Sequence, residues 1–300
     1  MDEDCAPAFR VFRRKAYGAV RAARAKLPAM SQPRTPPRRR FGILVGRRRV
    51  WAVSSIHAEI ERLRTIHVAI ERRLQPGDAL VYLGNMIGRG TAVRETLDEL
   101  LTFRRSFIAR PGAFASDLVY LRGSQEEMWQ KLLELQFAPN PAEVYHWMLD
   151  HGLAATLEGY GIDRNHGLAA TRDGPVAITR WTNEVRAAVN GAPGHANLLT
   201  ALRRAAYTAD NELLFVHAGI DPSRPLTAQH DSFWWGGAGF LDLTEPFGGY
   251  AKVVRGFDKH HGGLQQAPFA VSMDRGCGFG GPLAAACLTL DGQVAEAYEA

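Results

Sequence analysis

The sequence predicts an α/β fold in which short strands alternate with amphipathic helices. Short apolar runs recur along the chain, and between them apolar residues return every three or four positions. The 300 residues are 46% hydrophobic and 22% charged, which is typical of a globular domain with a sizeable core. No apolar run approaches the roughly 20 residues that a membrane-spanning helix needs, which excludes a transmembrane segment.

The first half of the expected domain contains three strand–helix pairs. Apolar residues at Ile56, Ile60, Leu63 and Ile70 define the first helix, and Pro76-Gly77 ends it. The expected strands are 50–53, 79–83 and 118–121, and the expected helices are 56–74, 91–105 and 126–135. Alternation of this kind indicates a sheet built from parallel βαβ units.

The second half combines a helical stretch with further strands. Gly and Pro interrupt residues 139–207, which are otherwise expected to be mostly helical. Further strands are expected at 213–216, 252–254, 269–271 and 283–290. We therefore expect one domain over 41–300, with 139–207 as a helical insert.

A basic leader precedes this domain. Residues 1–49 hold 14 Lys and Arg and 3 acids, a charge of +11, so residues 50–300 carry −6 of the net +5. Apolar positions from Phe9 to Leu27 return at helical spacing, and the Pro- and Arg-rich stretch that follows predicts a flexible leader over 1–40. Two interpretations stay open: a solvated tail, or contact of residues 9–49 with nucleic acid or an anionic membrane surface.

The cysteines do not indicate a disulfide or a metal site. Cys5, Cys277 and Cys287 are an odd number and lack metal-type spacing. The acidic Asp2 and Glu3 stand where a secretory signal would be positively charged. We expect reduced thiols and a cytoplasmic protein.

Polar or glycine-rich turns follow several of the expected strands, where ligands bind on open α/β sheets. They are 54–58 (SSIHA), 84–90 (GNMIGRG), 122–127 (RGSQEE), 217–222 (HAGIDP), 255–258 (RGFD) and 274–276 (DRG).

Together these turns resemble the motifs of the metallophosphoesterases, in particular bacterial serine/threonine protein phosphatases. The family's motifs GDxHG, GDxxDRG, GNHE, HAG, GHT and D-T-G occur in the same order and at similar separations, and the resemblance covers 41–300. It implies a two-sheet β-sandwich flanked by helices. It also implies a dinuclear centre of Mn or a similar divalent metal, which activates water to attack a phosphoester.

Most of the family's functional positions carry a different residue here. Ser55 and Asn85 replace metal-binding aspartates, Ser124 replaces an asparagine ligand, and Phe257 replaces a metal-binding histidine. Gln125 stands at the position of the catalytic histidine, Gly88 at that of the DRG aspartate, and Arg275 at that of the D-T-G threonine. The retained residues are His57, Arg89, Glu126, His217 and Asp274.

These substitutions predict a pseudophosphatase with a binding or regulatory role. Two divalent ions bring a charge of +4 that Ser55 and Asn85 cannot offset, Phe257 offers no donor atom, and glutamine cannot protonate a leaving alkoxide. His57 and His217 are then vestigial ligands, and no cofactor is expected. The alternatives are an active phosphoesterase with a rearranged metal site, acting on a phosphoprotein or a dinucleotide polyphosphate, and binding through the leader.

Arginines at the site favour a bound anion. Arg89 and Arg255 are candidates to bind a phosphate-bearing ligand or a phosphoprotein, with Arg275 as a further arginine near the cleft. The alternative is that Arg89 pairs with a neighbouring acid while the other two are solvated. His260 or His261 is a candidate to replace the histidine of the GHT motif, through a local shift of the loop.

Overall fold

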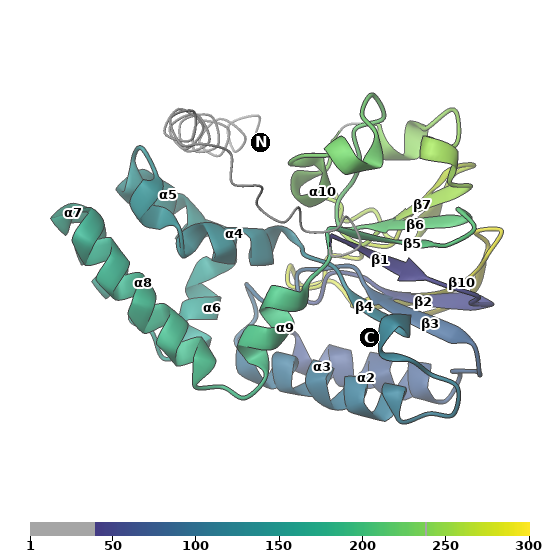
Figure 1. Cartoon of the computed structure of the whole chain (residues 1–300), viewed down its shortest axis with the longest axis horizontal. Helices are drawn as coiled ribbons and strands as arrows, with labels where there is room; N and C mark the ends of the chain where they lie inside the picture. The colour runs from purple at the N-terminus through teal and green to yellow at the C-terminus, as the bar shows by residue number, and fades with distance from the viewer. Residues whose placement is uncertain (1–39, 238) are drawn as a thin grey trace, which may run out of the picture.

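Two β-sheets lie face to face at the centre of the molecule (Figure 1), in a computed structural model that describes residues 40–237 and 239–300. The six-stranded sheet consists, in spatial order, of β1 (Phe41–Leu44), β5 (Ala205–Thr208), β6 (Leu213–Val216), β7 (Lys252–Arg255), β9 (Ala270–Ser272) and β8 (Gln265–Gln266). The five-stranded sheet consists of β11 (Val294–Glu299), β10 (Ala284–Thr289), β2 (Arg49–Val53), β3 (Asp78–Tyr82) and β4 (Leu118–Tyr120). The expected α/β class, with two sheets flanked by helices, is confirmed.

The strands at the centre of the five-stranded sheet are buried on both faces. In β2, Trp51 and Val53 belong to the core shared with the helices, whereas Val50 and Ala52 pack between the two sheets. Val254 of β7 joins the core between the sheets from the opposite side. Because successive side chains of a strand point to opposite faces, burial on both sides explains why these strands are unbroken apolar runs.

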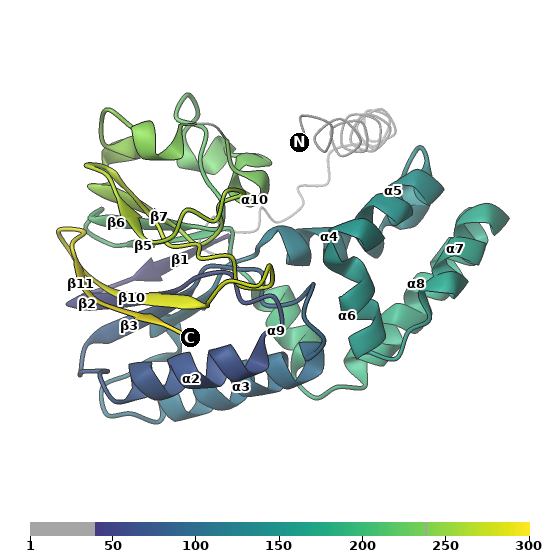
Figure 2. The same ribbon diagram turned by 180° about the vertical axis from the view of Figure 1, so that it is seen from behind.

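Helices α2 (Ile60–Glu71) and α3 (Val93–Ile108) cover the outer face of the five-stranded sheet (Figures 1 and 2). The helix expected from residue 56 begins only at Ile60. His57 and Ala58 have φ angles of 53° and 60°, which are not helical. The amides of Ile56 and His57 donate instead to the carbonyl of Asn85, at 3.0 and 2.6 Å, so this loop is tied to the turn after β3.

A helical region projects to one side of the sheets, at the left of Figure 1. Its helices are α4 (Ser124–Leu132), α5 (Pro141–Met148), α6 (Ala154–Gly159), α7 (Arg164–Asp173), α8 (Pro175–Asn190) and α9 (His195–Ala201). Residues 139–207 are mostly helical, and the last of them form β5. Strand β5 pairs in parallel with β1. The sequence did not predict β1, because its apolar run is short and contains Gly42.

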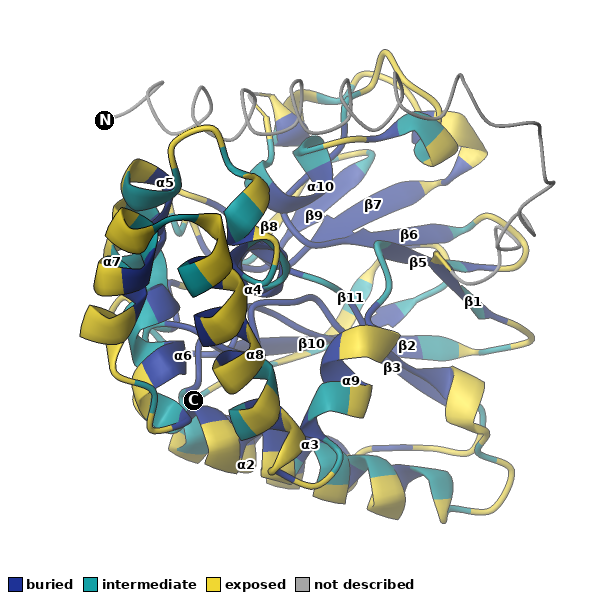
Figure 3. Ribbon diagram, turned by 60° about the vertical axis from the view of Figure 1, so that its left-hand side comes forward, coloured by how far each residue is buried: buried dark blue, intermediate teal, exposed yellow. Residues whose placement is uncertain are grey.

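The outer face of the six-stranded sheet is covered by short elements. They are α10 (Ser232–Trp235) and the 3-10 turns Phe240–Asp242 and Phe247–Gly249. Phe233, Phe240 and Phe247 pack there against Leu214 and Val253. In Figure 3, strands β6, β7 and β9 are coloured as buried. The outer helices α7 and α8, in contrast, carry exposed residues on one side.

Within the part of the chain that the structure describes, no helix has the length and hydrophobicity that crossing a bilayer requires. The leader, apart from Arg40, lies outside the described residues, so the predictions made for it stay predictions.

Candidate functional site

The turns that follow β2, β3, β4, β6 and β7 meet at one end of the two sheets. The side chain of His57 contacts that of Asn85, and the carbonyl of Gly256 accepts a hydrogen bond from the Ser55 amide at 3.1 Å. The amide of Gly256 in turn donates to the carbonyl of His217 at 2.9 Å. The motif positions identified in the sequence are thus brought into one site.

Glu126 holds this site together. Its carboxylate is buried and accepts backbone N–H bonds from Asn85 (3.0 Å), Met86 (2.7 Å), Ile87 (3.2 Å) and Gly123 (2.7 Å). Burial raises the pKa of Glu126, and the four hydrogen bonds partly oppose that rise. The retained glutamate therefore fixes the turn after β3 to the start of α4.

The side-chain amide of Asn85 is fully engaged with its neighbours. Its Oδ1 accepts hydrogen bonds from Ser124 Oγ at 3.1 Å and from the Gln125 amide at 3.0 Å. Because a backbone N–H can only donate, this contact fixes which end of the amide is oxygen. Nδ2 then donates to Nε2 of His57 at 3.2 Å, which places the imidazole proton of His57 on Nδ1.

Ser55 and Gln125 are also committed to the protein itself. Ser55 Oγ donates to the carbonyl of Gly256 at 3.1 Å, and Gln125 Nε2 donates to the carbonyl of His151 at 2.8 Å. A Cβ at Gly88 would lie 2.2 Å from Gln125 Oε1. Gly88 also has a φ of 87°, so a side chain at this position would be strained and would displace the end of the glutamine side chain.

Two retained histidines flank Phe257. The ring of Phe257 stacks on His217, with centroids 5.4 Å apart, and meets His57 edge-on at 6.4 Å. His217 donates from Nδ1 to the carbonyl of Leu83 at 2.7 Å, and its burial lowers its pKa to about 4. His57 Nδ1 and His217 Nε2 are buried and have no hydrogen-bond partner among the described residues.

These residues do not fit a pair of divalent metals. The oxygens at Ser55 and Asn85 are neutral and already hydrogen-bonded, and Phe257 has no donor atom. Across residues 40–237 and 239–300, no three His, Cys, Asp or Glu side chains are grouped so that they could hold a metal ion. Hard cations need anionic oxygen ligands, so the centre that the family resemblance implies is not supported by this donor set.

The three arginines have different surroundings. Arg255 forms an ion pair with Asp258 at 2.9 Å and donates to Ser272 Oγ at 2.9 Å. Arg275 pairs with Glu299 at 2.9 Å. Arg89 forms no ion pair with any described carboxylate, its Nε is buried without a partner, and desolvation lowers its pKa. The alternative considered from the sequence is reversed, because Arg89 is unpaired and the other two are paired.

His261 turns toward the site, whereas His260 is exposed. His261 Nδ1 lies 2.8 Å from Asp274 Oδ2, and its ring contacts Phe257 at 6.0 Å between centroids. Asp274 also accepts from the amides of Asp258 and Gly276, both at 2.9 Å. The retained aspartate thus joins two loops at the edge of the site.

Phe279 was not identified from the sequence. Its ring lies 3.9 Å from the Arg89 guanidinium, 5.4 Å from His57 and 4.4 Å from His261, centroid to centroid for the two histidines. It stands in a glycine-rich run, 276–281 (GCGFGG), and that isolated bulky residue was the available signal. The ring covers the side chains of Arg89 and His57.

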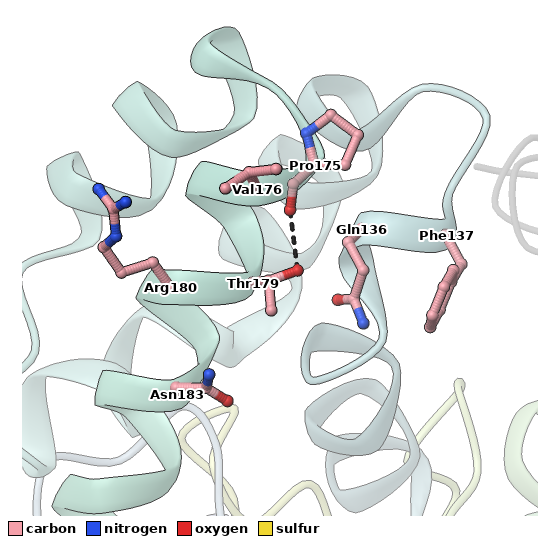
Figure 4. Close-up of a pocket in the computed structure, with 7 residues that line it drawn as sticks. All are labelled: Gln136, Phe137, Pro175, Val176, Thr179, Arg180 and Asn183. Atoms are coloured by element: carbon pink, nitrogen blue, oxygen red, sulfur yellow. Dashed lines mark hydrogen bonds between the residues drawn. The ribbon is translucent and has the colours of Figure 1, made fainter.

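A separate groove lies on the helical region (Figure 4). Its volume is about 660 Å³, and it is lined by Gln136, Phe137, Pro175, Val176, Thr179, Arg180 and Asn183. Thr179 Oγ1 donates to the carbonyl of Pro175 at 2.8 Å, as drawn in the figure. None of these residues belongs to the six turns, so the groove is distinct from the candidate site.

Comparison with known proteins finds likeness only among solved structures. No family model matches the chain, and no curated protein matches it. Three similar structures are a protein serine/threonine phosphatase from Saccharomyces cerevisiae, a cold-active protein tyrosine phosphatase and a metallophosphoesterase from Sphaerobacter thermophilus.

All three likenesses are at low sequence identity. The yeast protein is 12% identical with a TM-score of 0.49, over 87% of this chain and 84% of that one. The cold-active phosphatase is 13% identical with a TM-score of 0.48, over 85% of this chain and 80% of that one. The Sphaerobacter protein is 12% identical with a TM-score of 0.43, over 84% of this chain and 88% of that one.

The chain's own architecture agrees with the sequence resemblance. Two facing sheets are flanked by helices, and the six turns lie in the expected order along the chain. This is the two-sheet architecture that the resemblance to the metallophosphoesterases implies. Among the positions that the resemblance marks as functional, Ser55, Asn85 and Phe257 differ from the family's motifs, whereas His57 and His217 match them.

Proposed function

We propose that this protein is a pseudophosphatase: a metallophosphoesterase-type fold that binds a phosphate-bearing ligand and does not hydrolyse it. The observation that carries the proposal is the arrangement around Asn85. Its amide binds His57, Ser124 and the backbone of Gln125, so the groups at the former ligand positions satisfy one another.

Hydrolysis needs an activated nucleophile and an acid for the leaving group. The neutral oxygens of Ser55 and Asn85 do not offset the charge of a metal that would activate water. Gln125 stands where the acid is expected, and it is fixed by its bond to His151. A carboxamide does not release a proton near neutral pH, so neither half of the reaction is supported.

Anion binding is supported by groups that the substitutions left in place. Arg89 carries a positive charge that no described carboxylate neutralises, and His57 presents an N–H that has no acceptor. Both are donors, and a guanidinium forms strong charge-assisted bonds to phosphate oxygens. A phosphate group, free or on a phosphoprotein, is the ligand chemistry that these donors fit.

Two measurements test this proposal. Metal analysis and turnover of an aryl phosphate with added Mn²⁺ should give neither tight binding of two metals nor measurable hydrolysis. Calorimetric titration with inorganic phosphate should show binding that Arg89→Gln removes and that Arg180→Gln, on the distant groove, leaves unchanged. Two tightly bound metals with robust turnover would instead establish the active phosphoesterase.

A further inference from the structure

Phe279 covers the unpaired groups of the candidate site. It lies in the loop between β9 and β10, and the residue is 43% exposed although its ring contacts side chains from three other loops. The Arg89 guanidinium lies 3.9 Å from the ring, and His261 approaches the same ring at 4.4 Å. The ring therefore occupies space through which solvent would otherwise reach Arg89.

The groups next to the ring are buried and lack partners. Arg89 Nε and His57 Nδ1 each make no hydrogen bond with any described residue. His57 meets Phe279 edge-on at 5.4 Å. A buried donor without an acceptor is unfavourable, so two of them beside one exposed ring indicate a site for an acceptor ligand.

The loop is anchored at its base and open at its tip. A Cβ at Gly278 would lie 2.4 Å from the His57 Cβ, and one at Gly281 would lie 1.9 Å from the Arg275 carbonyl oxygen, so both positions are closely packed. At Gly280 a Cβ would meet nothing within 4 Å.

The anchored backbone leaves the ring as the part that can move. The Phe279 amide donates to the Gly276 carbonyl at 2.8 Å, which holds the turn. Rotation about the side-chain bonds of Phe279 therefore moves the ring without unfolding the loop, and exposed side chains rotate rapidly.

We propose that Phe279 is a latch over the phosphate-binding site, closed by its contact with Arg89 and opened when a phosphate group takes its place. This inference rests on the proposed function and adds the residue that sets the affinity for phosphate. The closed ring and the ligand compete for one guanidinium: the cation–π contact holds Arg89 in the free protein, whereas charge-assisted hydrogen bonds hold it in the complex.

The latch is tested by varying its ring and titrating with inorganic phosphate. Phe279→Ala should tighten phosphate binding roughly tenfold, because it removes one partly desolvated cation–π contact. Phe279→Trp should weaken binding, because indole is the stronger partner for a cation. Phe137→Ala is the matched control, since it removes another exposed phenylalanine, on the separate groove, and should leave the affinity unchanged.

The outcomes distinguish the latch from the proposed function on which it rests. If the wild type binds phosphate through Arg89 but the alanine and tryptophan variants bind equally well, the latch is wrong and the proposed function stands. If wild type, Phe279→Ala and Phe137→Ala are all folded by circular dichroism and none binds phosphate, the proposed function fails and the latch fails with it. Opposite shifts in the two Phe279 variants, with an unchanged control, support both.

Discussion

The ring of Phe257 stacks on the imidazole of His217, with centroids 5.4 Å apart and ring planes inclined by 14°. An aromatic ring without donor atoms therefore lies against one of the two histidines that the site retains. The imidazole therefore has an apolar neighbour where the resemblance to the metallophosphoesterases implies a second metal ligand.

Restoring one ligand should not restore a metal centre. We expect Phe257→His alone to bind no more Mn²⁺ than the wild type, because Ser55 and Asn85 stay neutral. The triple variant Ser55→Asp, Asn85→Asp, Phe257→His adds the missing anionic oxygens and should retain metal after dialysis, measured by elemental analysis. Equal metal retention in the single and triple variants would contradict the charge argument.

The pH dependence of stability should report the neutral state of His217. Burial lowers its pKa to about 4, whereas an unfolded histidine titrates near about 6.5. Since the folded pKa is the lower one, the stabilisation is present above pH 6.5 and is lost as the pH falls toward 4.

Between pH 7 and 4.5, the wild type should lose about 2 to 3 kcal/mol more unfolding free energy than His217→Gln. Urea denaturation at both pH values measures this difference. The same pH dependence in both proteins would show that the imidazole is not kept neutral by folding.

Arg255 should contribute to stability and not to ligand binding. Its ion pair with Asp258 is buried, with both side chains 9% exposed, and removing one partner of such a pair costs about 3 kcal/mol or more. We expect Arg255→Gln to lower the unfolding free energy by that amount and to leave phosphate affinity within twofold of wild type. The double variant with Asp258→Asn should be less destabilised than the sum of the two single changes.

Glu126 should be a structural residue. Glu126→Gln replaces an acceptor of four backbone N–H bonds by a group whose NH₂ faces those donors, so we expect a loss of about 2 to 4 kcal/mol in urea unfolding. Glu134→Gln, on an exposed side chain, is the control and should change stability by less than about 0.5 kcal/mol. Comparable effects of the two changes would show that the Glu126 carboxylate does not hold the turn after β3 to the start of α4.

Gly88 and Gln125 should be energetically coupled. Gly88 has a φ of 87°, and its added Cβ would meet the glutamine side chain, so Gly88→Ala should be destabilising through both strain and overlap. Shortening the neighbour in Gln125→Ser should recover part of that loss in a double-mutant cycle. Additive effects would show that the close approach does not determine the residue at position 88.

The order of elements could be predicted because it depends on local patterns. The runs at 50–53 and 79–83 are apolar throughout since both faces of their strands are buried, and this signal is visible in the sequence. The start of α2 was misplaced because positive φ angles at His57 and Ala58 follow from contacts with the turn after β3. Strand β1 was missed because its run is short and contains Gly42, and because its partner β5 lies more than 150 residues away in the chain.

The sequence by itself determined the α/β class and the order of the six turns, since residue types and spacing are sufficient for each. Its resemblance to the metallophosphoesterases implied that Ser55 and Asn85 stand where the family has aspartates. Only the tertiary structure decided which groups surround these positions. In the structure, Asn85 binds His57 and Phe279 lies over the site. Arg255 pairs with Asp258, whereas Arg89 forms no ion pair with a described carboxylate. These contacts link residues from different loops, and such contacts depend on how the sheets bring strand ends together, which no local pattern records.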